Sequence, residues 1–241
     1  MKTIGMLGGM SWESSIEYYR IINQVTRQRL GGLHSANLVM VSVDFAPIEL
    51  LQSQDRWEEA AILLAASARQ VQAAGADFLL IATNTMHKVY PQIQAALDIP
   101  VVHIADATAH KIREAGLERI GLLGTIYTMQ QDFYKGRLQE QYGLEIIVPG
   151  ESDQRQVNQV IFEELVLGKI REESREMYSQ VIQGLIAMGA QGIILGCTEI
   201  PLIVNPEDFD VPIFDTTHIH AETAVDIALN AKELDISMFV D

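Results

Sequence analysis

The chain alternates short apolar runs with longer segments whose apolar residues recur at helical spacing. The runs that we interpret as strands are Thr3–Leu7, Leu38–Val43, Phe78–Ala82, Val101–Ile104, Ile120–Leu123, Ile146–Val148, Gly192–Leu195 and Ile213–Phe214. Helix-period segments fill most of the gaps. Because strands joined through helices run parallel, the pattern predicts an α/β protein with mainly parallel sheets flanked by helices.

Two of the expected helices start with capping-box chemistry. Ser14 precedes Glu17 by three positions, and Asp55 precedes Glu58 in the same way. A hydroxyl or carboxylate at the cap can accept a backbone N–H of the first turn. We therefore expect helices to begin at these two positions, the second continuing to Ala74.

The sequence also repeats itself. Segments recur in the same order, Ile4–Gly8 as Ile120–Gly124, Gly75–Thr83 as Gly189–Cys197, and Ile99–Val102 as Val211–Phe214. Any single match is what α/β units share locally, but several matches in register indicate duplication. We expect two pseudo-symmetric lobes, residues 1–115 and 116–241, with a C-terminal helix that can cross over to the first lobe.

The repeat makes Thr83 and Cys197 equivalent positions, each at the end of an expected strand. Ligands of open parallel sheets bind beyond the carboxyl ends of the strands, and pockets favour domain interfaces. We expect the active site in the cleft between the lobes, with these two side chains approaching one molecule from opposite sides. Such a geometry suits stereochemical inversion.

Cys197 is the chain's single cysteine, so it cannot form an internal disulfide. At a strand end before a helix-compatible stretch, backbone N–H groups can favour a thiolate. The alternative is a small buried core residue, as lone cysteines often are. The strand-end position and the repeat partner favour the reactive interpretation, and no Cys, His or Asp spacing suggests a metal site.

Composition narrows the function further. The formal charge is −15 with 48% hydrophobic residues, which argues against nucleic acid as a partner because phosphates would be repelled. No apolar stretch is long enough to cross a membrane, and the first residues predict a strand rather than a signal peptide. The expected location is the cytoplasm.

Four motifs resemble the aspartate/glutamate racemase family over nearly the whole chain: Gly8–Glu13, Ala82–His87, Gly121–Thr125 and Gly196–Glu199. The Gly-Gly-Met opening and the Glu199 that follows Cys-Thr look like the aspartate racemase branch. The resemblance is closest to the L-aspartate/glutamate-specific racemases that carry a Thr/Cys pair.

The resemblance implies a two-base isomerase that needs no cofactor, no metal and no pyridoxal phosphate. Cys197 would be the base for L-aspartate and L-glutamate, and Thr83, in place of a second cysteine, would serve the opposite face. A hydroxyl is a much weaker acid than a thiol. Turnover of D-enantiomers should therefore be slow or absent. The family's habit of dimerising suggests a homodimer.

Further candidates for substrate binding come from the loops and the motifs. Gly8 and Gly9 offer backbone N–H groups, and Lys169 and Gln52 lie near positions where relatives contact substrate. Glu199 could orient a proton-transfer group or the substrate amine. The full set of substrate-binding candidates is Met10, Gln52, Asn84, Thr85, Thr125, Lys169, Thr198 and Glu199.

Two other functions remain open at this stage. Single-cysteine decarboxylases of the same fold, such as arylmalonate decarboxylases, also protonate a carbanion with one thiol. A non-catalytic amino-acid-binding module would explain why Thr83 breaks the two-cysteine pair. The histidines His87, His103, His110, His218 and His220 show no ligand spacing, so we expect structural roles for them.

Overall fold

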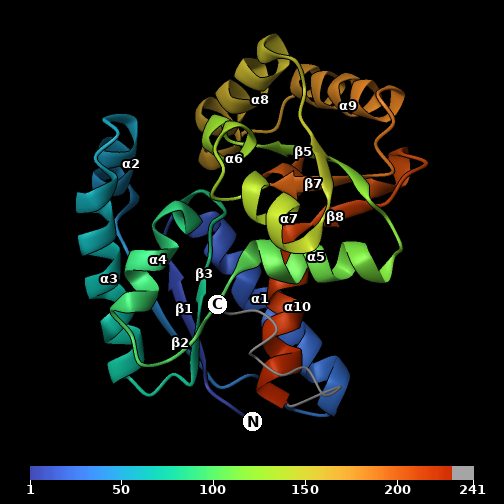
Figure 1. Ribbon diagram of the computed structural model, residues 1–241. Coiled ribbons are helices and arrows are strands. Elements are labelled where there is room, and N and C mark those ends of the chain that lie inside the picture. Colours follow the sequence, from blue (N-terminus) through green and yellow to red (C-terminus); the bar gives the residue numbers. More distant parts are fainter. Residues whose placement is uncertain (230–241) are drawn as a thin grey trace. The chain divides into compact units, whose positions relative to one another are not determined.

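The computed structural model describes residues 1–229. These residues form two compact units, Met1–Ala107 together with His220–Leu229, and Thr108–Ile219. Each unit contains one four-stranded sheet whose paired strands are all parallel (Figure 1). The predicted fold class, an α/β protein with two mainly parallel sheets flanked by helices, is confirmed.

The first sheet has the order β2-β1-β3-β4. Its strands are β1 (Ile4–Gly8), β2 (Leu38–Ser42), β3 (Phe78–Ile81) and β4 (Val101–Val102). The helices of this part of the chain are α1 (Trp12–Leu30), α2 (Phe45–Ser53), α3 (Trp57–Ala73), the 3₁₀ helix η1 (Thr85–Val89) and α4 (Tyr90–Ala95).

The second sheet has the order β6-β5-β7-β8. Its strands are β5 (Arg119–Gly124), β6 (Glu145–Ile147), β7 (Gly192–Gly196) and β8 (Ile213–Asp215). The helices that accompany it are α6 (Ile126–Gln130), α7 (Lys135–Tyr142), α8 (Glu151–Glu163), α9 (Glu172–Ala187), and the 3₁₀ helices η2 (Leu165–Leu167), η3 (Ile200–Leu202) and η4 (Pro206–Asp208). Helices α5 (Ile104–Glu114) and α10 (Thr216–Leu229) each contribute residues to both units.

The two sheets share one strand order, so the internal repeat is confirmed. The repeated segments form β1 and β5, β3 and β7, and β4 and β8, which hold the same places in their sheets. Every strand predicted from the sequence exists, with small shifts at the ends. The largest difference is β4, which stops at Val102 because α5 already begins at Ile104.

Both predicted helix starts are wrong by a few residues. Helix α1 is capped by Ser11, whose Oγ accepts from the Ser14 N–H at 3.5 Å, while the Ser14 hydroxyl donates to the Ser11 carbonyl. Helix α3 begins at Trp57 without a side-chain cap. The Asp55 carboxylate instead accepts a hydrogen bond from the indole N–H of Trp57. In both cases the polar side chain has a different local partner from the one that the pattern predicted.

Two glycines of β1 show how its helices reach the sheet. A Cβ on Gly5 would lie 2.7 Å from Val71 Cγ1 of α3, and a Cβ on Gly8 would lie 2.7 Å from Ser15 Oγ of α1. Because side chains alternate between the faces of a strand, α3 and α1 cover opposite faces of the first sheet. Apolar residues of α3, among them Leu64, pack there into a buried core.

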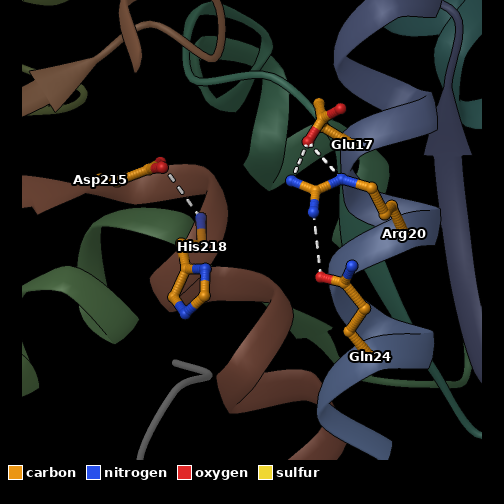
Figure 2. A network of polar contacts seen from close by, with 5 residues as sticks. All are labelled: Glu17, Arg20, Gln24, Asp215 and His218. Carbon is orange, nitrogen blue, oxygen red and sulfur yellow. Dashed lines mark hydrogen bonds and ion pairs between the residues drawn. The ribbon is translucent and has the colours of Figure 1, made fainter. Parts of the chain in front are cut away.

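Figure 2 shows polar contacts within helix α1 and at the start of helix α10. On α1, the Arg20 guanidinium donates to Glu17 Oε2 and Gln24 Oε1. At the start of α10, Asp215 Oδ1 accepts from the backbone N–H groups of Thr217 and His218, at 2.9 and 3.1 Å. None of the helices within residues 1–229 is long and apolar enough to cross a membrane.

Candidate active site

At the carboxyl end of the second sheet, β5 and β7 finish side by side. Gly124 and Gly196 are register partners. A Cβ on Gly124 would lie 2.8 Å from the Gly196 carbonyl oxygen, and a Cβ on Gly196 would lie 2.8 Å from the Leu123 carbonyl oxygen. Thr125 and Cys197 follow these glycines directly, so the structure brings two predicted site residues to one sheet edge.

The Cys197 thiol is part of a buried polar cluster. Its Sγ donates to Glu199 Oε2 at 3.0 Å, and the Thr198 hydroxyl donates to the same oxygen at 2.8 Å. All three residues are buried, with Glu199 only 3% exposed. A single carboxylate oxygen therefore holds both neighbouring donors in place.

This environment keeps the thiol protonated at rest. Burial raises the pKa of Cys197 well above its ordinary value, and the charge of Glu199 and its hydrogen bond raise it further. The backbone N–H groups of Thr198 and Glu199 act in the other direction but are the smaller effects. The strand-end N–H groups act in favour of a thiolate, as expected, but desolvation outweighs them.

Tyr178, on α9, shares the same surroundings. Its hydroxyl donates to the Val157 carbonyl at 3.2 Å. Burial raises the pKa of Tyr178 well above its usual value, and the charges of Cys197, Glu199 and Glu164 raise it further. Tyr178 was not among the candidates predicted from the sequence.

The remaining candidates of this unit are placed differently. Thr125 is buried and caps α6, with its Oγ1 accepting from the Thr128 N–H at 3.3 Å. Lys169 lies on an exposed turn after η2, where its N–H donates to the Glu164 carbonyl at 2.9 Å. Thr125 thus accompanies Cys197, whereas Lys169 stays at the surface and its contact with substrate remains a prediction.

In the first unit, the loop after β1 is fixed by a close backbone approach. Gly9 has φ +95°, and a Cβ there would lie 2.2 Å from the Val43 carbonyl oxygen. Its N–H donates to Ser15 Oγ at 2.8 Å. The expectation that this N–H serves a substrate carboxylate is wrong, since helix α1 already uses it.

Thr83 follows β3 and is held through its own backbone. Its N–H donates to the Ile81 carbonyl at 2.8 Å, and its carbonyl oxygen lies 2.8 Å from His87 Nδ1. Thr83 is 8% exposed, close to the 7% of Cys197. The two repeat-equivalent residues therefore share a strand-end position and a similar degree of burial.

The other candidates of the first unit are buried on neighbouring elements. Met10 and Ile48 belong to one apolar cluster, and Gln52 lies one helical turn after Ile48 on α2. Asn84 and Thr85 directly follow Thr83 and open η1. The structure thus gathers these candidates in the first unit: Met10, Gln52, Thr83, Asn84 and Thr85.

One contact of Thr83 was not predicted from the sequence. His87, expected to be structural, touches the Thr83 carbonyl four positions back. The spacing of the two residues was a readable signal, because residues four apart lie on one face of a helical turn. Within residues 1–229, no group of three His, Cys, Asp or Glu side chains is arranged to hold a metal ion.

Comparison with known proteins agrees with this architecture. The family described as Asp/Glu/Hydantoin racemase matches residues 7–224. A broad-specificity amino-acid racemase of Bacillus subtilis is 25% identical over 234 residues, which are 92% of this chain and 96% of that relative. The fold and the match define an isomerase of the racemase type.

Solved structures extend the comparison. A protein of Yersinia pestis assigned to the Asp/Glu racemases is 55% identical, with a TM-score of 0.89 over 95% of this chain and 100% of that one. An aspartate racemase homologue of Pyrococcus horikoshii is 34% identical, with a TM-score of 0.82 over the same shares. The chain belongs to the Asp/Glu/Hydantoin racemase family.

Proposed function

We propose that the protein is a cofactor-independent racemase of aspartate, glutamate or both, with Cys197 and Thr83 serving opposite faces of Cα. The observation that carries the proposal is the Cys197–Glu199 hydrogen bond at the end of β7, at the position that the repeat pairs with Thr83. A thiol beside a carboxylate can both lose and regain a proton.

The first step uses this pair. Because the resting thiol is protonated, its proton moves from Sγ to Glu199 Oε2, which lies 3.0 Å away. The thiolate then takes the Cα proton of an L-substrate and becomes a thiol again. The electron pair of the broken C–H bond stays on the substrate as a carbanion, which fixed hydrogen-bond donors stabilise.

The second step delivers a proton from the other face. The Thr83 hydroxyl donates its proton to Cα and regains one from solvent, acting as a relay, while Glu199 loses to solvent the proton it took from Sγ, so that every group returns to its starting state. A thiol has a reference pKa of about 8.5, and an aliphatic hydroxyl is far less acidic, so Thr83 is a poor base. We therefore propose a preference for L-enantiomers and slow turnover from the D-side.

The acidic substrate fits the polar residues around the two positions. Gln52, Asn84, Thr85 and Thr125 are buried and carry neutral polar side chains that can donate to carboxylates. Neutral donors suit a protein whose net charge of −15 opposes anions at long range. Before it takes the thiol proton, the Glu199 carboxylate can act as a counter-charge for the substrate ammonium. Met10 would supply an apolar contact and Lys169, from the surface, a cation.

The proposal also covers the protein's location, its oligomeric state and its cofactor requirement. We expect a cytoplasmic homodimer that requires neither metal nor pyridoxal phosphate. Activity should survive a chelator and hydroxylamine treatment, and the mass in solution should be that of two chains. Loss of activity with hydroxylamine would contradict the cofactor-independent mechanism.

Deuterium exchange at Cα tests the assignment directly. L- and D-aspartate and glutamate are incubated in heavy water with the wild type, Cys197→Ser, Thr83→Cys and Thr83→Ser. We expect exchange to be lost in Cys197→Ser and exchange from the D-enantiomer to rise in Thr83→Cys. Undiminished exchange in Cys197→Ser would overturn the proposal.

The same assay separates the alternatives. Release of carbon dioxide from an arylmalonate without racemisation would indicate a single-cysteine decarboxylase. Tight amino-acid binding without any solvent exchange would indicate a binding module.

A further inference from the structure

The first unit contains a buried cluster of three histidines, one of which contacts Thr83. His87, His103 and His220 are all at most 2% exposed. The ring centroids of His87 and His103 are 4.4 Å apart, and those of His87 and His220 are 6.1 Å apart. The Tyr18 hydroxyl on α1 lies 2.9 Å from His220 Nδ1, and Tyr90 packs edge-on against His103.

The partners of His87 fix its protonation. A carbonyl oxygen can only accept, so the 2.8 Å contact with the Thr83 oxygen requires a proton on Nδ1. The Ile104 N–H donates to Nε2 at 3.2 Å, so that nitrogen must carry a lone pair. His87 is therefore the neutral tautomer with its proton on Nδ1.

The neighbouring rings are neutral for the same kind of reason. His220 Nε2 donates to the Val102 carbonyl at 2.9 Å, and burial lowers the pKa of this ring to about 4, so Nδ1 carries no proton and accepts from Tyr18. His103 Nδ1 accepts from the Ala105 N–H at 3.2 Å. All three rings of the cluster are therefore neutral.

We propose that His87 is a positioning residue for Thr83, holding the turn that carries the Thr83 side chain through the Nδ1–H bond to its carbonyl. This inference rests on the proposed function, in which Thr83 delivers a proton to Cα. The turn has its second anchor in the Thr83 N–H bond to Ile81. The His87 ring also ties this turn to the first residue of α5, through Ile104.

Two substitutions separate the bonds of His87. In His87→Asn, the amide nitrogen takes the place of Nδ1 and can donate to the Thr83 carbonyl, while the Ile104 N–H loses its acceptor. In His87→Gln, the amide oxygen reaches the place of Nε2 and serves Ile104, while the Thr83 carbonyl loses its donor. Each variant loses one buried hydrogen bond, so they form a matched pair for stability.

The readout is the ratio of inversion to Cα deuterium exchange for the L-substrate. Exchange requires Cys197, whereas inversion also requires Thr83. We expect His87→Asn to keep the wild-type ratio and His87→Gln to lower it by roughly 10- to 100-fold, the cost of a small misplacement of a reacting group. Equal ratios in the two variants would overturn the proposal, because general damage lowers both rates alike.

Nuclear magnetic resonance decides the positioning role without activity. We expect the ¹⁵N shifts of His87 to show a protonated Nδ1, and the Thr83 carbonyl ¹³C resonance to move in His87→Gln but not in His87→Asn. A proton on Nε2, or the same Thr83 shift in both variants, would overturn the inference. A wild type without racemisation or exchange would count against the proposed function alone, since these spectra still report on the turn.

Discussion

Cys197 Sγ donates a hydrogen bond to Glu199 Oε2 across 3.0 Å, inside a buried cluster at the end of β7. The carboxylate has two opposed effects. Its charge makes the thiolate costly at rest, and its oxygen is the nearest acceptor for the thiol proton. Removal of the Glu199 carboxylate should therefore change the reactivity of the Cys197 thiol and the rate of catalysis in opposite directions.

We expect Glu199→Gln to raise the reactivity of the thiol while lowering catalysis. Loss of the charge lowers the pKa of Cys197, so more thiolate is present at pH 8 and iodoacetamide alkylation becomes faster. An amide cannot take the thiol proton, so Cα exchange should fall by roughly 100-fold, as expected for loss of a general base. Both rates are measured on the same sample.

The control is Glu207→Gln, which removes an exposed carboxylate on η4. We expect this variant to keep both wild-type rates. If alkylation and exchange fell together in Glu199→Gln, the carboxylate would be needed for structure rather than for proton transfer.

Stability should decrease at alkaline pH because of Cys197. The pKa of its thiol is raised in the folded state, so the unfolded chain loses the proton first as the pH rises. The stabilisation is complete below the unfolded pKa of about 8.5 and is lost above it at about 1.4 kcal/mol per pH unit. Urea unfolding of Cys197→Ser should show a flatter pH dependence above this value.

Tyr178 provides the comparison for the alkaline limb. Its pKa is also raised, but from an ordinary value of 10.0. Tyr178→Phe should therefore flatten the dependence only above about pH 10, in a later window. If the unfolding free energy of Cys197→Ser fell with pH between about 8.5 and 10 as steeply as that of the wild type, the assignment of a raised thiol pKa to Cys197 would be contradicted.

Stability should decrease at acidic pH because of His220. Burial lowers the pKa of this imidazole from 6.5 to about 4, and the hydrogen bond to Val102 opposes the shift only in part. The unfolded chain binds the proton first as the pH falls. The stabilisation is thus complete above 6.5 and is lost between 6.5 and 4, at about 1.4 kcal/mol per pH unit.

His220→Gln tests this directly, because its amide can still donate to the Val102 carbonyl. Urea unfolding from pH 7 to pH 4 should show a shallower decline than in the wild type. His34→Gln, at an exposed position, should leave the decline unchanged. An equal slope in His220→Gln and the wild type would mean that this imidazole titrates alike in both states.

Gly9 should tolerate no side chain. Gly9 and Gly75 have nearly the same φ, +95° and +93°, but a Cβ on Gly75 meets nothing within 4 Å. Gly75→Ala should therefore cost about 1–3 kcal/mol of unfolding free energy through strain alone. Gly9→Ala adds a clash with the Val43 carbonyl and should cost several kcal/mol more. If both variants lost the same unfolding free energy in urea, the loop after β1 would be able to shift and relieve the clash.

Much of the site was readable from the sequence because the relevant residues are local to strand ends. A strand followed by a turn places Thr83 or Cys197 beyond the carboxyl edge whatever else the chain does. Glu199 is only two positions from Cys197, so their contact needs little tertiary organisation. The helix starts failed for a related reason, since Ser14 and Asp55 each had several local partners and the pattern could not rank them.

The sequence by itself determined the α/β class, the strands, the repeat and the equivalence of Thr83 and Cys197, because periodicity and strand-end position are local properties. Only the tertiary structure decided that the Cys197 thiol is protonated, since burial depends on distant residues such as Val157 and Tyr178 that pack with it in one core. It also decided that His87 is neutral, because His87 Nε2 accepts a hydrogen bond from the Ile104 N–H, which is 17 residues away in the sequence.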